Sequence, residues 1–112
     1  LMLDEEIAFG PGKADLLDAI KATGSISAAG KQMGMSYRRT WMLVDSMNRC
    51  FQQPLVETVT GGVRGGGSQL SVLGVEVLAR YRVLQAAIDD LTAEHFPVFQ
   101  PLLRERPLPP VT

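Results

Sequence analysis

The stretch that decides the fold runs from Gly24 to Asn48 and reads GSISAAGKQMGMSYRRTWMLVDSMN. Its first part predicts a short helix over residues 28–33. Ser27 is a suitable N-cap for that helix, and Ile26 stands just outside it, where a hydrophobic staple would lie. Gly34 then supplies the left-handed backbone conformation that ends a helix. The pattern therefore predicts a short helix and a tight turn.

A second helix follows the turn, capped by Ser36 and ending near Arg49 or Cys50, before Pro54. At 100° per residue its core face comprises Thr40, Val44, Met47 and Phe51. The opposite face comprises Arg38, Met42, Asp45 and Arg49. One flank comprises Tyr37, Trp41 and Asn48. The second helix is thus expected to bury one face and to present arginine near its start.

The flanking segments add helices and a hairpin. Upstream, residues 1–7 predict a short strand, and residues 13–23 predict a helix that Gly24 stops. Downstream, residues 55–60 have the β-branched content of a strand, residues 60–68 form a glycine-rich loop, and Gln69 starts a return strand. Ser71 caps a long last helix, which extends to about His95.

Two helices joined by a glycine turn and followed by a hairpin make a winged helix-turn-helix. The predicted fold is mainly α, with a small β-hairpin wing and a long C-terminal dimerisation helix. The small residues Ala28, Ala29 and Gly30 let the two helices approach closely. Residues 1–95 form the expected domain, and residues 96–112, which hold five of the seven prolines, form a tail expected to be irregular or mobile.

The long helix carries a seam typical of helix packing. Its members follow a 4-3-4-3-4 spacing: Val77, Tyr81, Leu84, Ile88, Leu91 and His95. A second apolar stripe comprises Val72, Val75, Leu78 and Val83. One small domain covers only one of these stripes with its own helices, so the pattern favours a homodimer.

The formal net charge of −1 hides an uneven distribution. Residues 1–20 carry one lysine against five acids, a balance of −4, and residues 67–112 have a balance of −1. Residues 21–66 carry two lysines and four arginines against two acids, a balance of +4. A phosphate backbone responds to local charge, so this segment favours nucleic acid as a partner. The alternative is charge scattered over a solvated surface.

The glycine-rich loop has two alternatives to a DNA-contacting wing. A phosphate loop of a nucleotide-binding protein requires Lys-Ser or Lys-Thr opening a helix, whereas Ser68 here returns into a strand. A merely flexible hairpin is the other alternative. In a wing, the glycines permit close approach to the sugar-phosphate chain, and Arg64 neutralises a phosphate or enters the minor groove.

A resemblance to a known family rests on residues in the same order along most of the chain. They are Gly24–Ala29, Gly34–Trp41, Met47-Asn48, Leu55–Glu57, the glycine loop, and Leu70-Ser71 with Gly74. They closely resemble the N-terminal DNA-binding domain of the molybdate-responsive regulators, the ModE family. The domain is also similar to that of LysR-type regulators, although the wing and Trp41 point to the molybdate group.

The resemblance implies a transcriptional regulator that binds a palindromic operator in double-stranded DNA as a dimer. In that family the long helix and the N-terminal segment build the dimer interface. We assign DNA binding to Ser25, Ser27, Ser36, Tyr37, Arg38, Arg39, Met42, Arg64, Gly65 and Gly66. We assign the dimer interface to Val77, Tyr81, Leu84, Ile88 and Leu91.

One departure from the family concerns molybdate. Full-length members carry a C-terminal oxyanion-binding module, and this chain ends about where that module would begin. The chain is expected to be either a short stand-alone member or a fragment, and we expect no cofactor and no molybdate site within it.

Several classes of protein are disfavoured. A lone cysteine, Cys50, allows no internal disulfide and no multi-cysteine zinc site, and it suits a reducing cytoplasm. The sequence has no run of about 18 apolar residues, so it predicts no membrane span. No nucleophile, base and orienting group converge: His95 has no partner, and the acidic pairs at 5–6 and 89–90 are expected to be solvated. The sequence therefore predicts a protein that is not an enzyme.

Three interpretations remain open. Winged helices also serve as protein-interaction scaffolds without DNA binding, because fold alone does not fix function. Trp41 is interpreted as structural, between the second helix and the wing, with DNA contact as the alternative. For Tyr37 a structural role and a DNA contact are weighed equally, since its hydroxyl at the helix start could reach a phosphate. Cys50 is expected to be a small buried hydrophobe.

Overall fold

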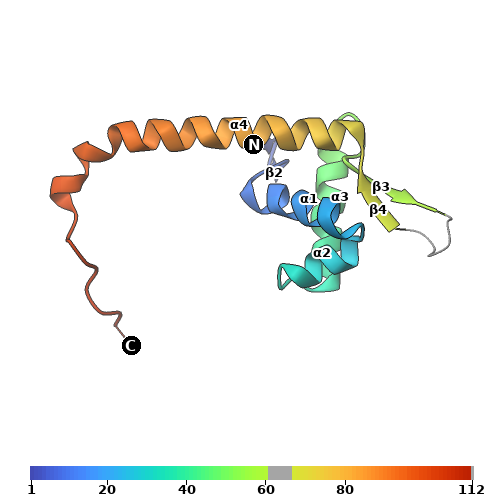
Figure 1. Ribbon diagram of the computed structural model, residues 1–112, viewed down its shortest axis with the longest axis horizontal. Coiled ribbons are helices and arrows are strands. Elements are labelled where there is room, and N and C mark those ends of the chain that lie inside the picture. The colour runs from blue at the N-terminus through green and yellow to red at the C-terminus, as the bar shows by residue number, and fades with distance from the viewer. Residues whose placement is uncertain (61–66, 112) are drawn as a thin grey trace. The chain divides into compact units, whose positions relative to one another are not determined.

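The computed structural model describes residues 1–60 and 67–111. The chain divides into two compact units, Leu1–Tyr81 and Arg82–Thr112. The first unit holds three helices, α1 (Pro11–Thr23), α2 (Ile26–Gln32) and α3 (Tyr37–Cys50), and the antiparallel pair β3 (Val56–Val59) and β4 (Gly67–Leu70) (Figure 1). This arrangement confirms the predicted winged helix-turn-helix.

The turn chemistry expected between the helices is present. Gly24 and Gly34 adopt φ values of 70° and 73°, the left-handed region that favours glycine. A Cβ atom on Gly30 would overlap the side chain of Thr40, so α2 and α3 cross where α2 has no side chain. The backbone N–H of Met35 donates to the carbonyl of Gly30 at 2.9 Å and closes the turn.

Several predictions about helix and strand starts were wrong, including the return strand β4, which starts at Gly67 rather than at Gln69. Ser25, not Ser27, caps α2, and its Oγ accepts the Ala28 N–H at 3.1 Å. The cause is Ile26, which is buried at 3% exposure as the first residue of the helix rather than as a staple outside it. The first seven residues form two short strands, not one.

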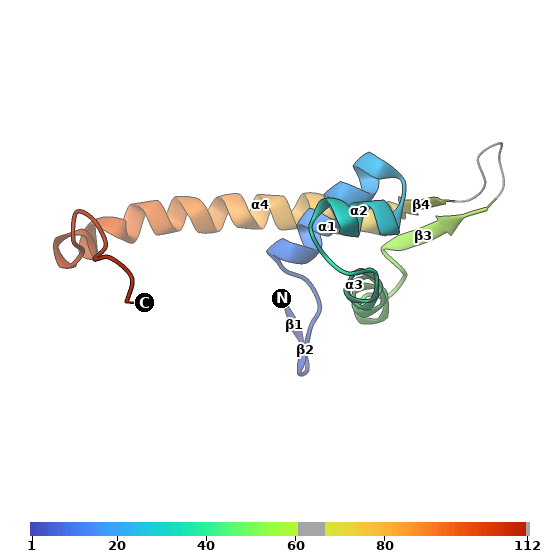
Figure 2. The same ribbon diagram turned by 90° about the horizontal axis from the view of Figure 1, so that it is seen from below.

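Those strands are β1 (Met2–Leu3) and β2 (Glu6–Ile7), and they pair as a hairpin through Asp4, whose φ is 52°. This N-terminal hairpin precedes α1 and lies apart from the β3–β4 wing in both ribbon views (Figure 2). Helix α1 starts two residues before the predicted position because Pro11 occupies its first turn, where proline costs no hydrogen bond.

The core of the first unit comes from every helix. The fully buried large side chains are Phe9, Leu16, Leu17, Ile20, Met47, Leu55 and Thr40. The ring of Phe9 packs edge-on against Tyr81, with centroids 5.1 Å apart, and against Phe51 at 6.1 Å. Thr40, Val44 and Met47 are buried, which confirms three of the four residues predicted for the core face of α3. The fourth, Phe51, follows the end of the helix and is half-buried against the core.

The last helix, α4 (Val72–His95), begins in the first unit. The Ser71 hydroxyl caps it as predicted, since its Oγ accepts the Gly74 N–H at 3.0 Å and donates to the Pro54 carbonyl at 2.7 Å. In the second unit α4 continues and is followed by two 3-10 turns, η1 (Phe96–Val98) and η2 (Gln100–Leu102). The start of the tail is therefore more regular than expected, because a proline presets the first turn of each.

Candidate nucleic-acid interface

The start of α3 presents two free arginines. Ser36 Oγ accepts the Arg39 N–H at 3.1 Å, which fixes the first turn of the helix. The side chains of Arg38 and Arg39 are exposed. Within the part of the chain that the structure describes, neither side chain takes part in an ion pair or hydrogen bond. Both charges are therefore available to a ligand.

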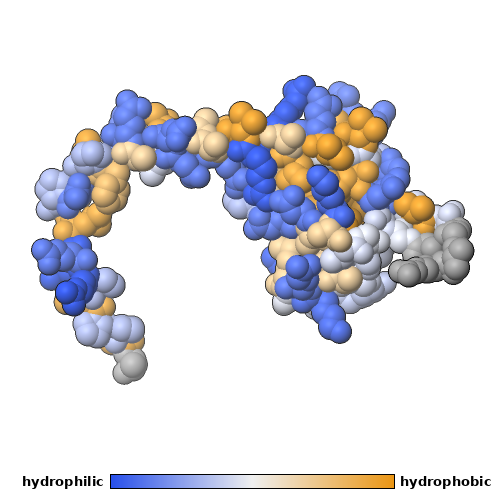
Figure 3. Space-filling model, in the orientation of Figure 1, coloured by the Kyte–Doolittle hydropathy of each residue, from blue (hydrophilic) through white to orange (hydrophobic). Residues whose placement is uncertain are grey.

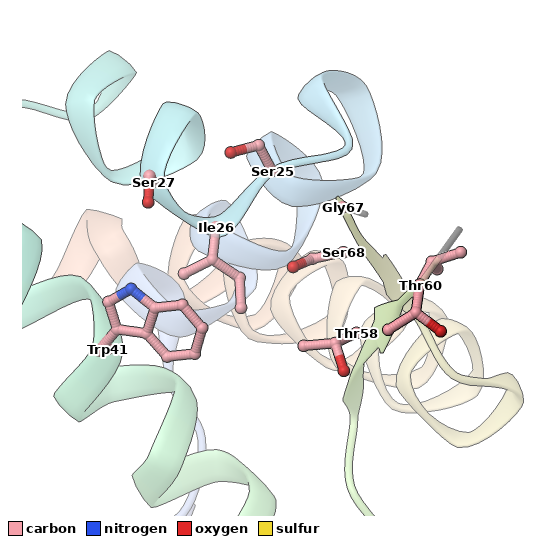
Figure 4. Close-up of a pocket in the computed structure, with 9 residues that line it drawn as sticks. Ser25, Ile26, Ser27, Trp41, Thr58, Thr60, Gly67 and Ser68 are labelled. Atoms are coloured by element: carbon pink, nitrogen blue, oxygen red, sulfur yellow. The ribbon is translucent and has the colours of Figure 1, made fainter. Parts of the chain in front are cut away.

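A shallow groove of about 340 Å³ lies between the start of α2, α3 and the wing. In Figure 4 the indole of Trp41 lies on one side, Thr58 and Ser68 on the other, and Ile26 between them. Other lining residues are Ser25, Ser27, Val59, Thr60 and Gly67. Five of the nine lining residues carry hydroxyl groups and none is charged, which suits contact with sugar and phosphate oxygens rather than with a compact ion.

Long-range hydrogen bonds hold the wing beside the helices. The Ser68 N–H donates to the Gly24 carbonyl at 2.8 Å, so β4 is tied to the turn between α1 and α2. Asn48 on α3 accepts the N–H groups of Leu55 at 2.9 Å and Val56 at 3.2 Å. The base of the wing is thus fixed against both helices that border the groove.

The C-terminal half of α3 holds a closed ion cluster. Arg49 donates to Glu6 at 2.6 Å and 3.2 Å and to Asp45 at 2.9 Å. The hydrogen bond from Arg49 lowers the pKa of the Glu6 carboxyl, and the hydrogen bond to Glu6 raises the pKa of the arginine. Glu6 is therefore not the freely solvated acid predicted from its sequence, and Arg49 is already neutralised.

Lys13 and Cys50 also lie beside this cluster. Lys13 is buried, its Nζ donates to the Ile7 carbonyl and to Ser46 Oγ at 3.0 Å, and burial lowers its pKa. Cys50 Sγ lies 3.8 Å from a Glu6 oxygen and is half-buried. The expectation that Cys50 is a buried hydrophobe was therefore wrong, because the N-terminal hairpin brings a carboxylate to it.

The residues predicted to bind DNA fall into three groups. Ser25 and Ser27 line the groove, and Ser36, Tyr37, Arg38, Arg39 and Met42 lie at the start of α3 or on its exposed face. Arg64, Gly65 and Gly66 lie outside the described residues. The sequence reasoning did not find Thr58, Thr60 and Ser68. Their polar character in a short hairpin was a signal, but only the fold brings them opposite Trp41.

The residues predicted to form the dimer interface divide between the two units. Val77 and Tyr81 pack against the core of their own chain. In the second unit, Leu84, Ile88 and Leu91 are 40%, 52% and 56% exposed. Apolar surface recurs along α4 and the segment after it (Figure 3).

Residues 1–60 and 67–111 hold no group of three or more histidine, cysteine, aspartate or glutamate side chains arranged to bind a metal ion. None of the helices found in those residues is both long and apolar enough to cross a membrane.

Comparison with known proteins shows what kind of domain this is. No family model matches the chain. The transcriptional regulator ModE of Yersinia pestis is 35% identical over 102 residues, which cover 88% of this chain and 39% of that protein. The molybdenum transport protein ModE of Herbaspirillum seropedicae is 50% identical over 70 residues, 62% of this chain and 26% of that protein.

The chain is a ModE-like winged helix-turn-helix domain. A third relative, the DNA-binding transcriptional dual regulator ModE of Escherichia coli strain K12, is 35% identical over 82% of this chain and 37% of that protein. This ModE-like chain thus spans 26–39% of the length of these three relatives.

Solved structures agree with the ModE-like fold. ArgP from Mycobacterium tuberculosis matches with a TM-score of 0.52 at 21% identity, over 81% of this chain and 32% of that chain. The PcaV transcriptional regulator from Streptomyces coelicolor matches with a TM-score of 0.52 at 20% identity, over 85% of this chain and 72% of that chain. At such identities the likeness concerns the fold.

Proposed function

We propose that this domain is the DNA-binding part of a transcriptional regulator and that it acts on double-stranded DNA rather than as an enzyme. The observation that carries the proposal is the pair of unpaired, exposed arginines, Arg38 and Arg39, on the first turn of α3. In helix-turn-helix proteins the N-terminal residues of the second helix meet the base edges in the major groove. The name of the E. coli relative, a DNA-binding regulator, supports the same partner.

The proposed docking uses both sides of the groove described above. Arg38 is suited to guanine, whose O6 and N7 accept two hydrogen bonds from one guanidinium. The hydroxyls of Ser27, Thr58 and Ser68 are suited to sugar and phosphate oxygens on one strand. Arg64, with Gly65 and Gly66, is assigned to the adjoining backbone on the sequence alone. In a bacterial cell, such as that of the E. coli relative, chromosomal DNA lies in the cytoplasm, which is the localisation we propose.

We also propose that the regulator is a homodimer bound to a palindromic operator. Leu84, Ile88 and Leu91 follow the i, i+4, i+7 spacing and are exposed along one stripe of α4 within the second unit. A second copy is the proposed cover, since a two-fold axis buries the same stripe of both chains. Two recognition helices would then be spaced by about one turn of DNA or a multiple of it.

The test is the salt dependence of binding to random duplex DNA. For a regulator that uses several phosphate contacts, the logarithm of the binding constant falls linearly with log[salt], with a slope of about −0.9 for each phosphate neutralised. We expect measurable binding at low salt and a steep slope. An absence of duplex binding at low salt would overturn the proposal and favour a protein-interaction scaffold. Where duplex binding is observed, selection from a random duplex pool would give the operator and the half-site spacing.

A further inference from the structure

The exposed face of α3 is unexpectedly apolar for a surface that meets DNA. Tyr37 is 68% exposed, Met42 is 60% exposed and Trp41 is 37% exposed. Single exposed apolar residues are ordinary on protein surfaces, but three within six residues of one helix form a patch that calls for a partner. The rings of Tyr37 and Trp41 lie 6.1 Å apart and tilted by 54°, so they shelter each other on one flank.

Met42 stands apart from that aromatic pair. It lies one helical turn after Arg38, and residues spaced by four stand one above the other on a helix. Met42 is therefore the next side chain along the face that presents the free arginine. It has no hydrogen-bond donor and only a weak acceptor in its thioether sulfur, so it is poorly suited to the polar edge of a base.

The ion cluster at the end of α3 limits which cationic side chains of this face are available to DNA. Arg49 shares this face, but its guanidinium is occupied by Glu6 and Asp45. Within the described part of α3, the unpaired cationic side chains are those of the first turn, Arg38 and Arg39. Beyond that turn this exposed face consists of Met42 and the paired Asp45 and Arg49, and Met42 is the one nearest to Arg38 along the helix.

The major groove displays one apolar group, the C5-methyl of thymine. We propose, on the basis of the function proposed above, that Met42 is a specificity-determining residue that packs against the C5-methyl of a thymine in each half-site. Four residues of helix rise about 6 Å, and base pairs are spaced by about 3.4 Å. The thymine therefore lies within about two base pairs of the base that Arg38 reads. Methionine suits this contact because its unbranched thioether adapts to an irregular surface.

The experiment replaces thymine by uracil, which pairs identically and lacks only the methyl group. Duplexes selected from a random pool by the full chain would be synthesised with uracil at one thymine position at a time. Binding would be measured by fluorescence anisotropy at fixed salt. We expect one position in each half-site at which uracil weakens wild-type binding about fourfold, the value of one buried methyl group.

Matched variants assign that loss to Met42. Met42→Ala should bind the thymine duplex more weakly and should no longer distinguish thymine from uracil at that position. Met42→Leu should retain the distinction, and so should Arg38→Ala, which removes a different contact. Met42 is exposed, so the Ala variant is expected to fold, and its circular dichroism and melting would be compared with the wild type.

Three outcomes are informative in different ways. Loss of the uracil effect in Met42→Ala alone supports the inference. Salt-dependent duplex binding without any uracil-sensitive position, or with an effect unchanged in Met42→Ala, overturns the inference while the DNA-binding proposal stands. No duplex binding by the wild type at low salt overturns the DNA-binding proposal and this inference with it.

Discussion

At the scale of single residues, the chemistry of α3 depends on which charges are already satisfied. Arg38 and Arg49 both lie on the outward face predicted for α3, but only Arg38 stands near the start of the helix. Arg49 is held by two carboxylates, whereas Arg38 has no partner among the described residues. An unpaired surface arginine pays little desolvation cost for a new contact with a base or phosphate. Arg38 is therefore the better candidate reader.

Replacing Arg38 by alanine should weaken binding to the selected operator by about 1–3 kcal/mol and relax the preference at one position of each half-site. The measurement is a titration of the selected duplex and of its single-base variants. Arg80→Ala is the matched control, because Arg80 is exposed but pairs with Glu76 on α4. Equal affinity of Arg38→Ala and wild type would remove α3 as the reading helix.

The Glu6–Arg49 pair should give the fold a dependence on acid. The hydrogen bond from Arg49 lowers the pKa of Glu6 from its ordinary value of 4.5. A carboxylate whose folded pKa is lowered stabilises the fold fully above its unfolded pKa, and that stability is lost as pH falls through the folded pKa. The free energy of unfolding, measured with urea, should therefore be smaller for Glu6→Gln than for wild type at pH 7. This difference should shrink as the pH falls below 4.5, the ordinary pKa of the carboxyl.

A double-mutant cycle isolates this pair from other acids. In an Arg49→Gln background, the Glu6→Gln change should lose most of its effect on unfolding and most of its pH dependence. A pH-dependent difference of the same size in both backgrounds would mean that another group lowers the pKa of Glu6.

At the scale of elements, the crossing of α2 and α3 depends on the absence of one side chain. The helices approach at Gly30, and Thr40 fills the space that a Cβ would take. Thr40 itself is fully buried, and its hydroxyl donates to the Ser36 carbonyl at 2.8 Å. It therefore has little freedom to move aside. The turn that joins the helices and the cap that starts α3 are thus coupled to this one contact.

Gly30→Ala should destabilise the domain by about 1–3 kcal/mol, the usual cost of overpacking, despite the better helix propensity of alanine. The matched control is Gly12→Ala in α1, where a Cβ meets nothing within 4 Å. That change should be neutral or stabilise by up to about 1 kcal/mol. Urea unfolding measures both. Equal stability of the two variants would show that α2 and α3 can separate at no cost.

At the scale of the whole molecule, the proposed dimer rests on the second unit. Val77 and Tyr81 are half-buried against the core of the first unit, whereas Leu84, Ile88 and Leu91 of the second unit are exposed. An unpaired stripe of leucine and isoleucine on a free chain is an aggregation liability, which a second copy removes. A dimer also doubles the DNA contacts and fixes their spacing.

Leu84→Asp should convert the dimer to monomer, because it buries an unpaired charge in the proposed interface. Sedimentation velocity at micromolar concentration measures the state, and tight binding to a palindromic operator should be lost with it. Ala86→Asp is the control, since it lies about 200° around α4 from Leu84 and should leave the dimer intact. A wild-type chain that sediments as a monomer would overturn the dimer proposal.

Features that depend on near neighbours were predictable from the order of the residues. The glycine turn at Gly34, the cap at Ser36, the core face of α3 and the change from helical to strand period after Pro54 all arise from contacts within a few residues. Periodicity and capping report such contacts directly. The same local pattern favoured Ser27 as the cap, because it precedes the small residues Ala28 and Ala29, whereas Ser25 caps the helix.

Features that join distant parts of the chain became visible only in the folded molecule. Ile26 is buried in the core as the first residue of α2, so Ser25 is the cap, and the ring of Tyr81 packs against Phe9. Glu6 forms an ion pair with Arg49, which lies 43 residues further along the sequence. Ion pairs and packing at such separations follow from the folded path of the chain rather than from sequence spacing. For this protein, the sequence placed Arg38 near the start of the predicted second helix. The fold shows that Arg49 is held by Glu6 and Asp45, whereas Arg38 has no partner among the described residues.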